Sequence, residues 1–290
     1  MKTGEVIRYL RVSKNIKANV LYFNILSRPA ILKFEKGISD TTTEKLFLIL
    51  NRLNVTLEEF YYIYNMKIEN EDNSFLRTYF ESFNSADINK LIDMREERLE
   101  LFSNEKNIKN LHYAALTDLT ISHLSKETLH IDSFNILKDY LIKCEEWHYY
   151  ELVLFTNSLD FFPEELIILL YRRAKQKMIF YKQMRKYSNE VFSLILNILV
   201  FFMERNNIER TELFFNELLN NRSKTNNMLY ENAMIIFMEE LMIIMKTKID
   251  TGAKIDEIIK IFQILDMQMK AEQCQRLYEL VQRNNLTNFF

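Results

Sequence analysis

Apolar residues recur three and four positions apart along most of the chain, which is the period of an amphipathic α-helix. In the first 65 residues this pattern covers Gly4–Lys14, Glu44–Leu53 and Leu57–Tyr64. Ile16–Gly37 reads as two further short helices joined by a tight turn. The pattern therefore predicts a head of five short helices over residues 1–65.

The second helix of that pair has clear end signals. Ser27 is the expected N-cap, Pro29 falls in the first turn, and Gly37 follows the last turn where a left-handed residue is favoured. Ile31 and Phe34, three residues apart, form the expected inner face. Helix-turn-helix pairs of this kind place the second helix in the DNA major groove. A helical hairpin that reads no groove is the alternative.

The remainder of the chain also has a helical period. Three Gly and two Pro in 290 residues are too few for the turns of parallel sheets or β-sandwiches, so an all-α protein is expected. The polar residues 66–74 are the best linker candidate, followed by a second domain at 75–290. The helices expected there are 75–83, 86–103, 106–123, 131–145, 147–159, 163–185, 188–205, 208–221, 225–247, 252–265 and 269–284. Short antiparallel helices favour an α-solenoid of degenerate tetratricopeptide-like hairpins, with a plain helical bundle as the alternative.

Charge is distributed unevenly between the two domains. The chain has a net charge of −2, whereas residues 1–65 carry ten Lys or Arg and six Asp or Glu, which makes that segment +4 and the remainder −6. A basic head on an acidic body suits a protein of which only the head contacts phosphate. The candidate DNA-binding residues are Arg8, Arg11, Lys14, Lys17, Ser27, Arg28, Ala30, Lys33 and Lys36.

The sequence contains few of the residue patterns that catalytic sites need. The four histidines are scattered without metal-ligand spacing, and three glycines at 4, 37 and 252 cannot build a phosphate loop. We therefore expect no enzymatic activity, no metal and no cofactor. Cys144 and Cys274 form no CxxC pair and suit a reducing compartment, and the head has no cysteine for a disulfide between two heads. We see no signal peptide, and Val191–Met203 is too short to span a bilayer, so a soluble cytoplasmic protein without membrane contact is expected.

One segment of the body, residues 146–160, combines aromatic and leucine stripes with an amide. Trp147, Leu152 and Phe155 recur at helical spacing and are expected in the core. Asn157 differs from them, because an amide is unfavourable inside a helix–helix seam. Forty residues later Asn197 lies in an equally apolar segment.

Two amides at this interval suggest one concave surface. Asparagine offers a donor and an acceptor together, so it can hold an extended peptide backbone whatever the side chains. A carboxylate three residues after the first amide, Asp160, would suit a cation or free amino terminus on such a ligand. The alternative is an ordinary satisfied asparagine in the core or on the surface. The candidate peptide-binding residues are Tyr150, Asn157, Asp160, Asn197 and Phe201.

Several motifs carry a family resemblance. G-x-x-I-R-x-L-R at Gly4–Arg11, L-S-x-x-x-I-x-x-F-E-x-G at Leu26–Gly37 and L-x-x-L-N-V-T-x-E-E-F at Leu50–Phe60 resemble the phage-repressor (XRE-type) DNA-binding domain. Together with W-x-x-Y-E-L-x-L-F-x-N-x-L at Trp147–Leu159 and the helical body, they make the chain resemble the Rgg/MutR family of Gram-positive transcriptional regulators, many of which are receptors for short peptide pheromones. The resemblance implies a homodimer with peptide on the concave faces of the repeat domains and double-stranded promoter DNA on the heads.

The same resemblance implies roles for single residues. Arg11 and Glu35 match a buried ion pair that ties the first helix to the recognition helix, with Gly37 as a structural residue at the end of that helix. Asn157 and Asn197 match amides that hold the ligand backbone.

The recognition helix also departs from the family pattern. Pro29 and Ala30 stand where small polar residues and a glutamine are usual, and Leu32 replaces another polar residue. Ala30 can still touch a thymine methyl group, and the neighbouring cations can hold phosphates or guanine. The DNA site is then read partly by shape, or specific DNA binding has been lost.

Three hypotheses follow from the sequence. The first is a dimeric transcription regulator that responds to a peptide. The second is a regulator of the same build that needs no ligand or takes a different one, and the third is a peptide-binding or protein-interaction module with a degenerate head. The apolar segments Met234–Met245 and Ile258–Met269 are candidates for the dimer contact, although their methionines also suit a core.

Overall fold

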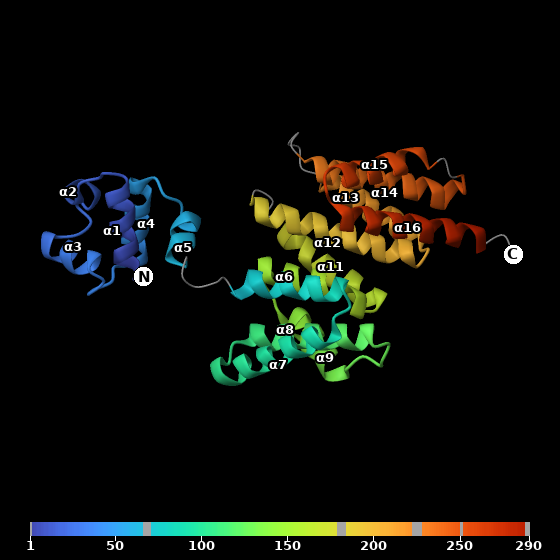
Figure 1. Cartoon of the computed structure of the whole chain (residues 1–290), viewed down its shortest axis with the longest axis horizontal. Helices are drawn as coiled ribbons and strands as arrows, with labels where there is room; N and C mark the ends of the chain where they lie inside the picture. Colours follow the sequence, from blue (N-terminus) through green and yellow to red (C-terminus); the bar gives the residue numbers. More distant parts are fainter. Residues whose placement is uncertain (1, 66–70, 179–183, 222–227, 250–251, 288–290) are drawn as a thin grey trace. The chain divides into compact units, whose positions relative to one another are not determined.

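The computed structural model describes residues 2–65, 71–178, 184–221, 228–249 and 252–287. Within these ranges the chain forms sixteen α-helices, one short 3-10 helix and no strand, so the all-α prediction is confirmed (Figure 1). Contacts divide the chain into two compact units, residues 1–85 and 86–290.

The N-terminal unit contains the five helices expected for the head and one more. Their bounds are α1 Thr3–Ser13, α2 Ala18–Leu21, α3 Arg28–Glu35, α4 Thr43–Leu53, α5 Leu57–Tyr64 and α6 Glu71–Asn84. Residues 66–70 of the expected linker, 66–74, lie outside the described residues. The remaining four, 71–74, form the first turn of α6. Contacts group α6 with the head, so the division falls after Ser85, later in the chain than we expected.

One apolar core holds the head helices together. In its interior the rings of Tyr22 and Phe34 pack edge to face, with their centroids 6.3 Å apart. Burying a large apolar side chain contributes roughly 2 kcal/mol, so this cluster stabilises helices that are too short to form alone. Its buried members are Val6, Ile7, Leu10, Leu21, Tyr22, Ile25, Ile31, Phe34, Ile49, Leu50, Leu53, Val55 and Phe60.

Helix α3 begins and ends where the sequence predicts, but one end signal differs. Ser27 is the N-cap residue by position, yet its side chain makes no capping hydrogen bond within the described head. The proline in the first turn removes one of the N–H groups that such a side chain accepts from. At the other end Gly37 has a φ of 65°. The N–H groups of Gly37 and Ile38 donate to the carbonyls of Phe34 and Lys33 at 2.8 and 2.9 Å, which are the two bonds of a Schellman motif.

The backbones of α1 and α3 approach each other closely at Gly4. A Cβ atom at this position would lie 1.7 Å from the carbonyl oxygen of Phe34 and 2.5 Å from its carbonyl carbon. Both atoms belong to the backbone, so neither can swing aside. The glycine that opens the head is therefore required by helix packing.

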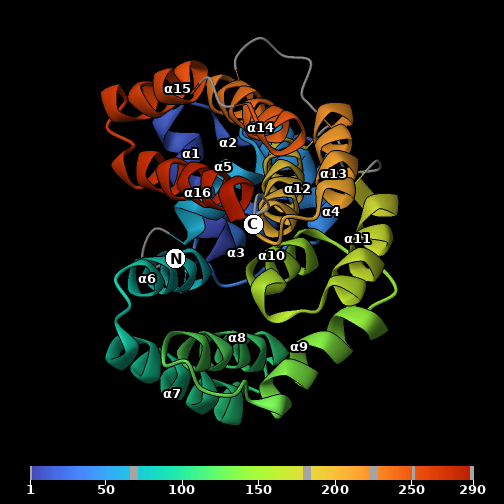
Figure 2. The same cartoon turned by 90° about the vertical axis from the view of Figure 1, so that its right-hand side faces the viewer.

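The C-terminal unit is built from consecutive helices that pack on their neighbours in sequence. Strong contacts join α7 to α8, α12 to α13 and α15 to α16. Figure 2 shows these helices following an arc, with α10 and α12 on its inner side and α11 and α13 outside them. The bounds are α7 Ile88–Glu105, α8 Ile108–Leu124, α9 Ile131–Lys143, α10 Tyr149–Ser158, the 3-10 helix η1 Leu159–Phe161, α11 Glu164–Met178, α12 Arg185–Glu204, α13 Ile208–Asn220, α14 Leu229–Thr247, α15 Ala253–Ile264 and α16 Gln268–Thr287.

Most of these ends lie within four residues of the predicted ones. Two predictions need correction. The helix expected over 163–185 ends at Met178, and α12 already begins at Arg185, with 179–183 outside the described residues. The helix expected over 147–159 gives way to the 3-10 helix after Ser158.

Helix α12 contains a long apolar segment. Its 18-residue window Tyr187–Glu204 has a mean hydropathy of 1.2 and is long enough to cross a membrane, unlike the shorter run marked in the sequence. The window is 61% buried, and the helix packs on α10, α13 and α16. Burial of this kind is a property of a core helix. Trp147 and Phe155, predicted as core, are also buried, with ring centroids 5.6 Å apart.

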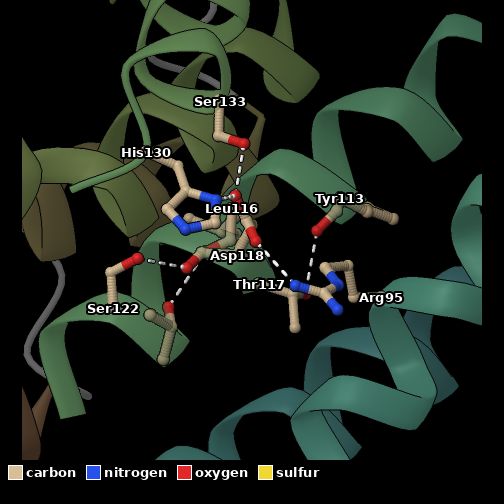
Figure 3. Close-up of polar contacts among 9 residues, drawn as sticks. Arg95, Tyr113, Leu116, Thr117, Asp118, Ser122, His130 and Ser133 are labelled. Carbon is tan, nitrogen blue, oxygen red and sulfur yellow. Dashed lines mark hydrogen bonds and ion pairs between the residues drawn. The ribbon is translucent and has the colours of Figure 1, made fainter. Parts of the chain in front are cut away.

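A carboxylate on α8 joins three elements (Figure 3). Asp118 Oδ1 accepts from Arg95 Nη1 of α7 at 2.9 Å, and Oδ2 accepts from Ser133 Oγ at 2.6 Å and contacts His130 Nδ1 at 2.8 Å, both near the start of α9. Burial alone would raise the pKa of Asp118, but the hydrogen bonds from Ser133 and Arg95 hold it below its ordinary value. Ser133 and His130 both meet Asp118 Oδ2, so the imidazole is not placed to take the proton of the hydroxyl as in a hydrolase triad. The cluster therefore has a structural role and connects α8 to α7 and to the start of α9.

A histidine on α8 is buried among aromatic rings. His112 Nδ1 lies 2.7 Å from Tyr150 Oη of α10, and the imidazole packs 4.2 Å from the Tyr140 ring of α9. Tyr140 Oη donates to Glu151 Oε1 at 2.6 Å. Burial lowers the pKa of His112 to about 4, against the opposing charge of Glu151. The imidazole is therefore neutral at neutral pH.

We predict that Gly4→Ala destabilises the head by about 2 to 3 kcal/mol, because the added methyl group collides with the Phe34 carbonyl and overpacking has costs of this size. Hydrogen exchange of the α1 and α3 amides in the full chain measures the effect. Ser13→Ala, at the exposed end of α1, is the matched control. Unchanged or greater protection in Gly4→Ala would contradict the close approach.

We also predict that His112 makes stability depend on pH. In the unfolded chain its pKa is near 6.5, so between this value and about 4 the unfolded state binds more protons and stability falls as the pH is lowered. The difference between the two pKa values corresponds to about 3 kcal/mol. Denaturant unfolding near neutral pH and in mild acid should show a smaller loss for His112→Asn than for the wild type. His123→Asn, at an exposed position of the same helix, should behave as the wild type, and equal losses in all three proteins would refute this prediction.

Candidate functional site

An ion pair ties α1 to the helix-turn-helix pair α2–α3. Arg11 Nε and Nη2 donate to Glu35 Oε1 and Oε2 at 2.7 and 2.9 Å, and Arg11 Nη1 donates to the carbonyl of Ile16 at 3.0 Å. Tyr22 Oη donates to Glu35 Oε1 at 2.9 Å. One carboxylate thus fixes α1, the end of α2 and the end of α3 relative to one another.

This pair is mostly shielded from water, since the side chains of Arg11 and Glu35 are 15% and 11% exposed. The hydrogen bond with Glu35 raises the pKa of Arg11. The pKa of Tyr22 is raised mainly by burial and, to a smaller extent, by its hydrogen bond with Glu35. Removing one partner of a buried pair costs about 3 kcal/mol, because the other charge stays buried and unpaired. Arg11 was predicted both as a DNA contact and as a structural residue. Its guanidinium is committed to the interior of the head, so we assign it the structural role.

The outer face of α3 mixes cations with an apolar side chain. Arg28, Leu32 and Lys36 are spaced four residues apart and form one line along the helix, and all three are exposed. Lys33 and Pro29 are exposed beside this line. Leu32 is 64% exposed at the centre of the face. Of the other predicted contacts on this helix, Ser27 is exposed and Ala30 is half-buried.

The remaining predicted cations lie outside α3. Arg8, exposed on α1, shares with Lys36 an open hollow of about 790 Å³ between α1 and α3, whose other lining residues are Glu5, Tyr9, Val12, Ser13 and Glu35. Lys17 is exposed at the N-cap of α2. Lys14, at the end of α1, donates to the carbonyl of Asn54 at 3.4 Å. The structure therefore brings Arg8 next to α3, whereas Lys14 is directed to the start of the α4–α5 turn.

The two predicted amides lie on adjacent helices of the inner side of the arc (Figure 2). Asn157 is half-buried in the last turn of α10, and its Nδ2 donates to the carbonyl of Val153 at 2.8 Å. This bond uses one amide hydrogen of a group that can make several hydrogen bonds. Asn197 is exposed on α12, in a stripe of helical spacing that also contains Ser193 and Glu204.

Charged side chains gather where η1 meets the end of α12. Asp160 is exposed, and its charge adds to burial in raising the pKa of Glu204. Phe201, predicted as a ligand contact, is only 3% exposed. The guanidinium carbon of Arg205 lies 3.4 Å above its ring, and Arg205 Nη1 donates to the Phe201 carbonyl at 3.1 Å. The surface here presents Arg205, so the prediction that the ring of Phe201 faces a ligand needs this correction. Tyr150 belongs to the His112 cluster described above, two helical turns before Asn157.

Sequence reasoning missed Glu204 and Arg205. Glu204 follows Asn197 by seven residues, which is two helical turns, so its place on the stripe could have been found from spacing. The bond from Tyr22 to Glu35 had no comparable signal, because it crosses the turn between α2 and α3. In the part of the chain that the structure describes, no three His, Cys, Asp or Glu side chains gather as metal ligands.

Comparisons with known proteins agree with this architecture. Residues 89–276 match the family model described as HTH-type transcriptional regulator Rgg, C-terminal domain. A protein from Listeria monocytogenes EGD-e, assigned as a transcriptional regulator, has a similar structure with a TM-score of 0.83 at 22% identity, over 99% of this chain and 97% of that one. The SHP pheromone receptor Rgg2 of Streptococcus dysgalactiae gives 0.75 at 19% identity, over 96% and 99%. PrgX in its complex with cCF10 gives 0.70 at 18% identity, over 96% and 92%.

At these identities the solved structures show a shared all-helical fold, whereas the family model covers more than half of the chain. The chain belongs to the Rgg family of HTH-type transcriptional regulators.

Proposed function

We propose that this protein is a homodimeric transcription regulator whose head binds double-stranded promoter DNA and whose helical-repeat unit binds a short linear peptide. The observation that carries the proposal is the match of residues 89–276 to the Rgg family behind a head with helix-turn-helix geometry. Solved relatives described as a pheromone receptor and as a receptor–pheromone complex support the peptide. The residues below give each part of the proposal its chemistry.

The exposed cations of the head support DNA binding. Arg28, Lys33 and Lys36 surround the outer face of α3, Arg8 adjoins Lys36, and Lys17 stands at the start of α2. Each such cation can neutralise a phosphate and release a counterion. The ion pair between Arg11 and Glu35 fixes α1 relative to α3, so the backbone positions that carry these cations keep a fixed spacing.

The inner side of the arc supports peptide binding. Asn157 and Asn197 offer amide groups on adjacent helices, and Asp160 and Glu204 add negative charge beside them. An extended backbone needs donors and acceptors at intervals, and a ligand cation would relieve the repulsion between the two carboxylates. A peptide with a free amino terminus or a basic residue fits this chemistry.

A homodimer needs an apolar contact, and the two predicted segments differ in how much apolar surface they expose. In Met234–Met245 the side chains of Met234, Met238 and Met245 are buried, while Ile236 and Ile243 are exposed. A larger group of apolar side chains is exposed at the end of α15 and the start of α16. The members are Ile261, Ile264, Leu265, Met267 and Met269. The ligand would act by binding one arrangement of this dimer more tightly than another, because equal affinity for both shifts nothing.

We predict that the full chain binds DNA from immediately upstream of its own gene and that Lys33→Gln or Lys36→Gln weakens this binding. Each substitution should reduce the slope of log affinity against log salt by about 1, since one phosphate contact is lost. Fluorescence anisotropy over a salt series measures it. Lys90→Gln, at an exposed position of α7, is the control and should leave the slope unchanged. A wild-type chain that ignores duplex DNA at low salt would favour the interaction module with a degenerate head.

We predict that Asp160→Asn weakens the binding of short peptides with a free amino terminus by about threefold, since exposed charge pairs contribute roughly 0.2–1 kcal/mol. Calorimetry with synthetic peptides from small reading frames beside the gene measures it, and the same peptides with acetylated amino termini should not distinguish the two proteins. Asp93→Asn on α7 is the matched control. Equal affinity of wild type and Asp160→Asn for a basic peptide would end this assignment. A peptide that binds without changing DNA affinity would favour the regulator that takes no peptide signal.

A further inference from the structure

The centre of the outer face of α3 is apolar, which is unusual for a helix that reads DNA by hydrogen bonds. Leu32 is 64% exposed there, between Arg28 one turn before it and Lys36 one turn after it. Pro29 is exposed and Ala30 half-buried on the preceding turn, and neither side chain can donate or accept a hydrogen bond. Single exposed apolar residues are common on proteins, so the position of Leu32 carries more weight than its exposure.

The chemistry of the major groove limits what such a side chain can meet. Guanine, cytosine and adenine present only donors and acceptors on that edge, whereas thymine adds the C5-methyl group. A leucine pressed against an amino or carbonyl edge would remove water from a polar group without replacing its hydrogen bond, which is unfavourable. Against a methyl group it buries apolar surface on both sides.

We propose that Leu32 is the specificity-determining residue of the head and that it selects thymine through the C5-methyl group, with Pro29, three residues before it on the same face, extending the apolar contact. This inference rests on the DNA binding proposed above and names what the recognition helix reads. It replaces readout by shape alone with a direct contact.

The charges around Leu32 favour DNA over an apolar protein surface as the occupant of this face. Arg28 and Lys36 are exposed one turn before and one turn after it, Lys33 is exposed to one side, and the head as a whole has a net charge of +4. A major groove offers apolar methyl groups at its floor and phosphates along both rims, which matches an apolar centre with a cationic border. An apolar protein partner would cover the leucine and leave the three cations without counterparts.

The test begins with the full chain and a random-sequence duplex pool, from which bound duplexes are selected at moderate salt. The best duplex is then synthesised in its unmodified form and in a series in which deoxyuridine replaces each thymidine in turn. In a further series each T·A pair is changed to C·G, once with cytosine and once with 5-methylcytosine. Deoxyuridine keeps every hydrogen-bonding group and every charge and removes only the methyl group. Binding is measured for the wild type, for Leu32→Ala and for Leu57→Ala, whose leucine is 51% exposed on α5.

We expect deoxyuridine at one or two positions to weaken wild-type binding about fourfold per methyl group, equivalent to about 0.8 kcal/mol. Leu32→Ala should bind the thymine duplex more weakly and lose the difference between thymine and deoxyuridine, while Leu57→Ala keeps it. The 5-methyl group on cytosine should restore part of the affinity lost by the C·G change.

Three results would overturn the proposal. Equal binding of thymine and deoxyuridine duplexes by the wild type would remove the methyl contact and leave the DNA-binding function intact. A thymine preference that persists in Leu32→Ala would assign the contact to another residue. A chain that enriches no sequence and ignores every duplex at low salt would overturn the proposed DNA function together with this inference. Circular dichroism of Leu32→Ala checks that the variant is folded, as is expected for a side chain mostly in solvent.

Discussion

The bidentate contact between Arg11 and Glu35 is the constraint on which the head depends. Helix α3 has eight residues, too few to hold its own direction, so neighbouring elements must orient it. Gly4 brings the backbone of α1 against the carbonyl of Phe34. The core buries one side of α3, and the ion pair holds the C-terminal end of α3 to α1. Because Tyr22 shares the same carboxylate, the turn is fixed together with the two helices. The DNA binding proposed for α3 needs this rigidity, since a small rotation would carry its cations away from the phosphates.

Carboxylates have the same connecting role in the C-terminal unit, which contains a single glycine among its residues. Asp118 joins α7, α8 and α9 through Arg95, Ser133 and His130 (Figure 3). Glu151 accepts from Tyr140 on one oxygen and from the backbone of His148 on the other. These carboxylates are satisfied by several donors within the fold. The bonds of Asp118 and the bond from Tyr140 to Glu151 join different helices, whereas the bond from the His148 backbone caps α10 itself.

Asp160 and Glu204, where η1 packs on α12, are in a different situation. Burial, and after it the charge of Asp160, raises the pKa of Glu204, so two carboxylates of like charge lie near each other. Groups perturbed by burial and by a like charge are frequent at binding sites. The two proposed surfaces thus have opposite electrostatic character: the outer face of α3 presents cations around an apolar side chain, and α10, η1 and α12 carry the two amides and the two carboxylates. A ligand and DNA would not compete for the same surface, and coupling between them has to pass through the arrangement of the units.

The sequence alone determined the helical class, most helix ends and the basic head, because these follow from local period, from turn residues such as Gly37 and from charge count. It also indicated the inner face of α3, since Ile31 and Phe34 repeat at helical spacing. Other features arose only when distant segments met in space. The need for glycine at position 4 comes from the Phe34 carbonyl, thirty residues away, and the bond from Tyr22 to Glu35 crosses the turn between α2 and α3. Whether Leu32 faces water or the core was likewise a matter of tertiary contacts, because a helix buries one stripe and only its neighbours decide how wide that stripe is.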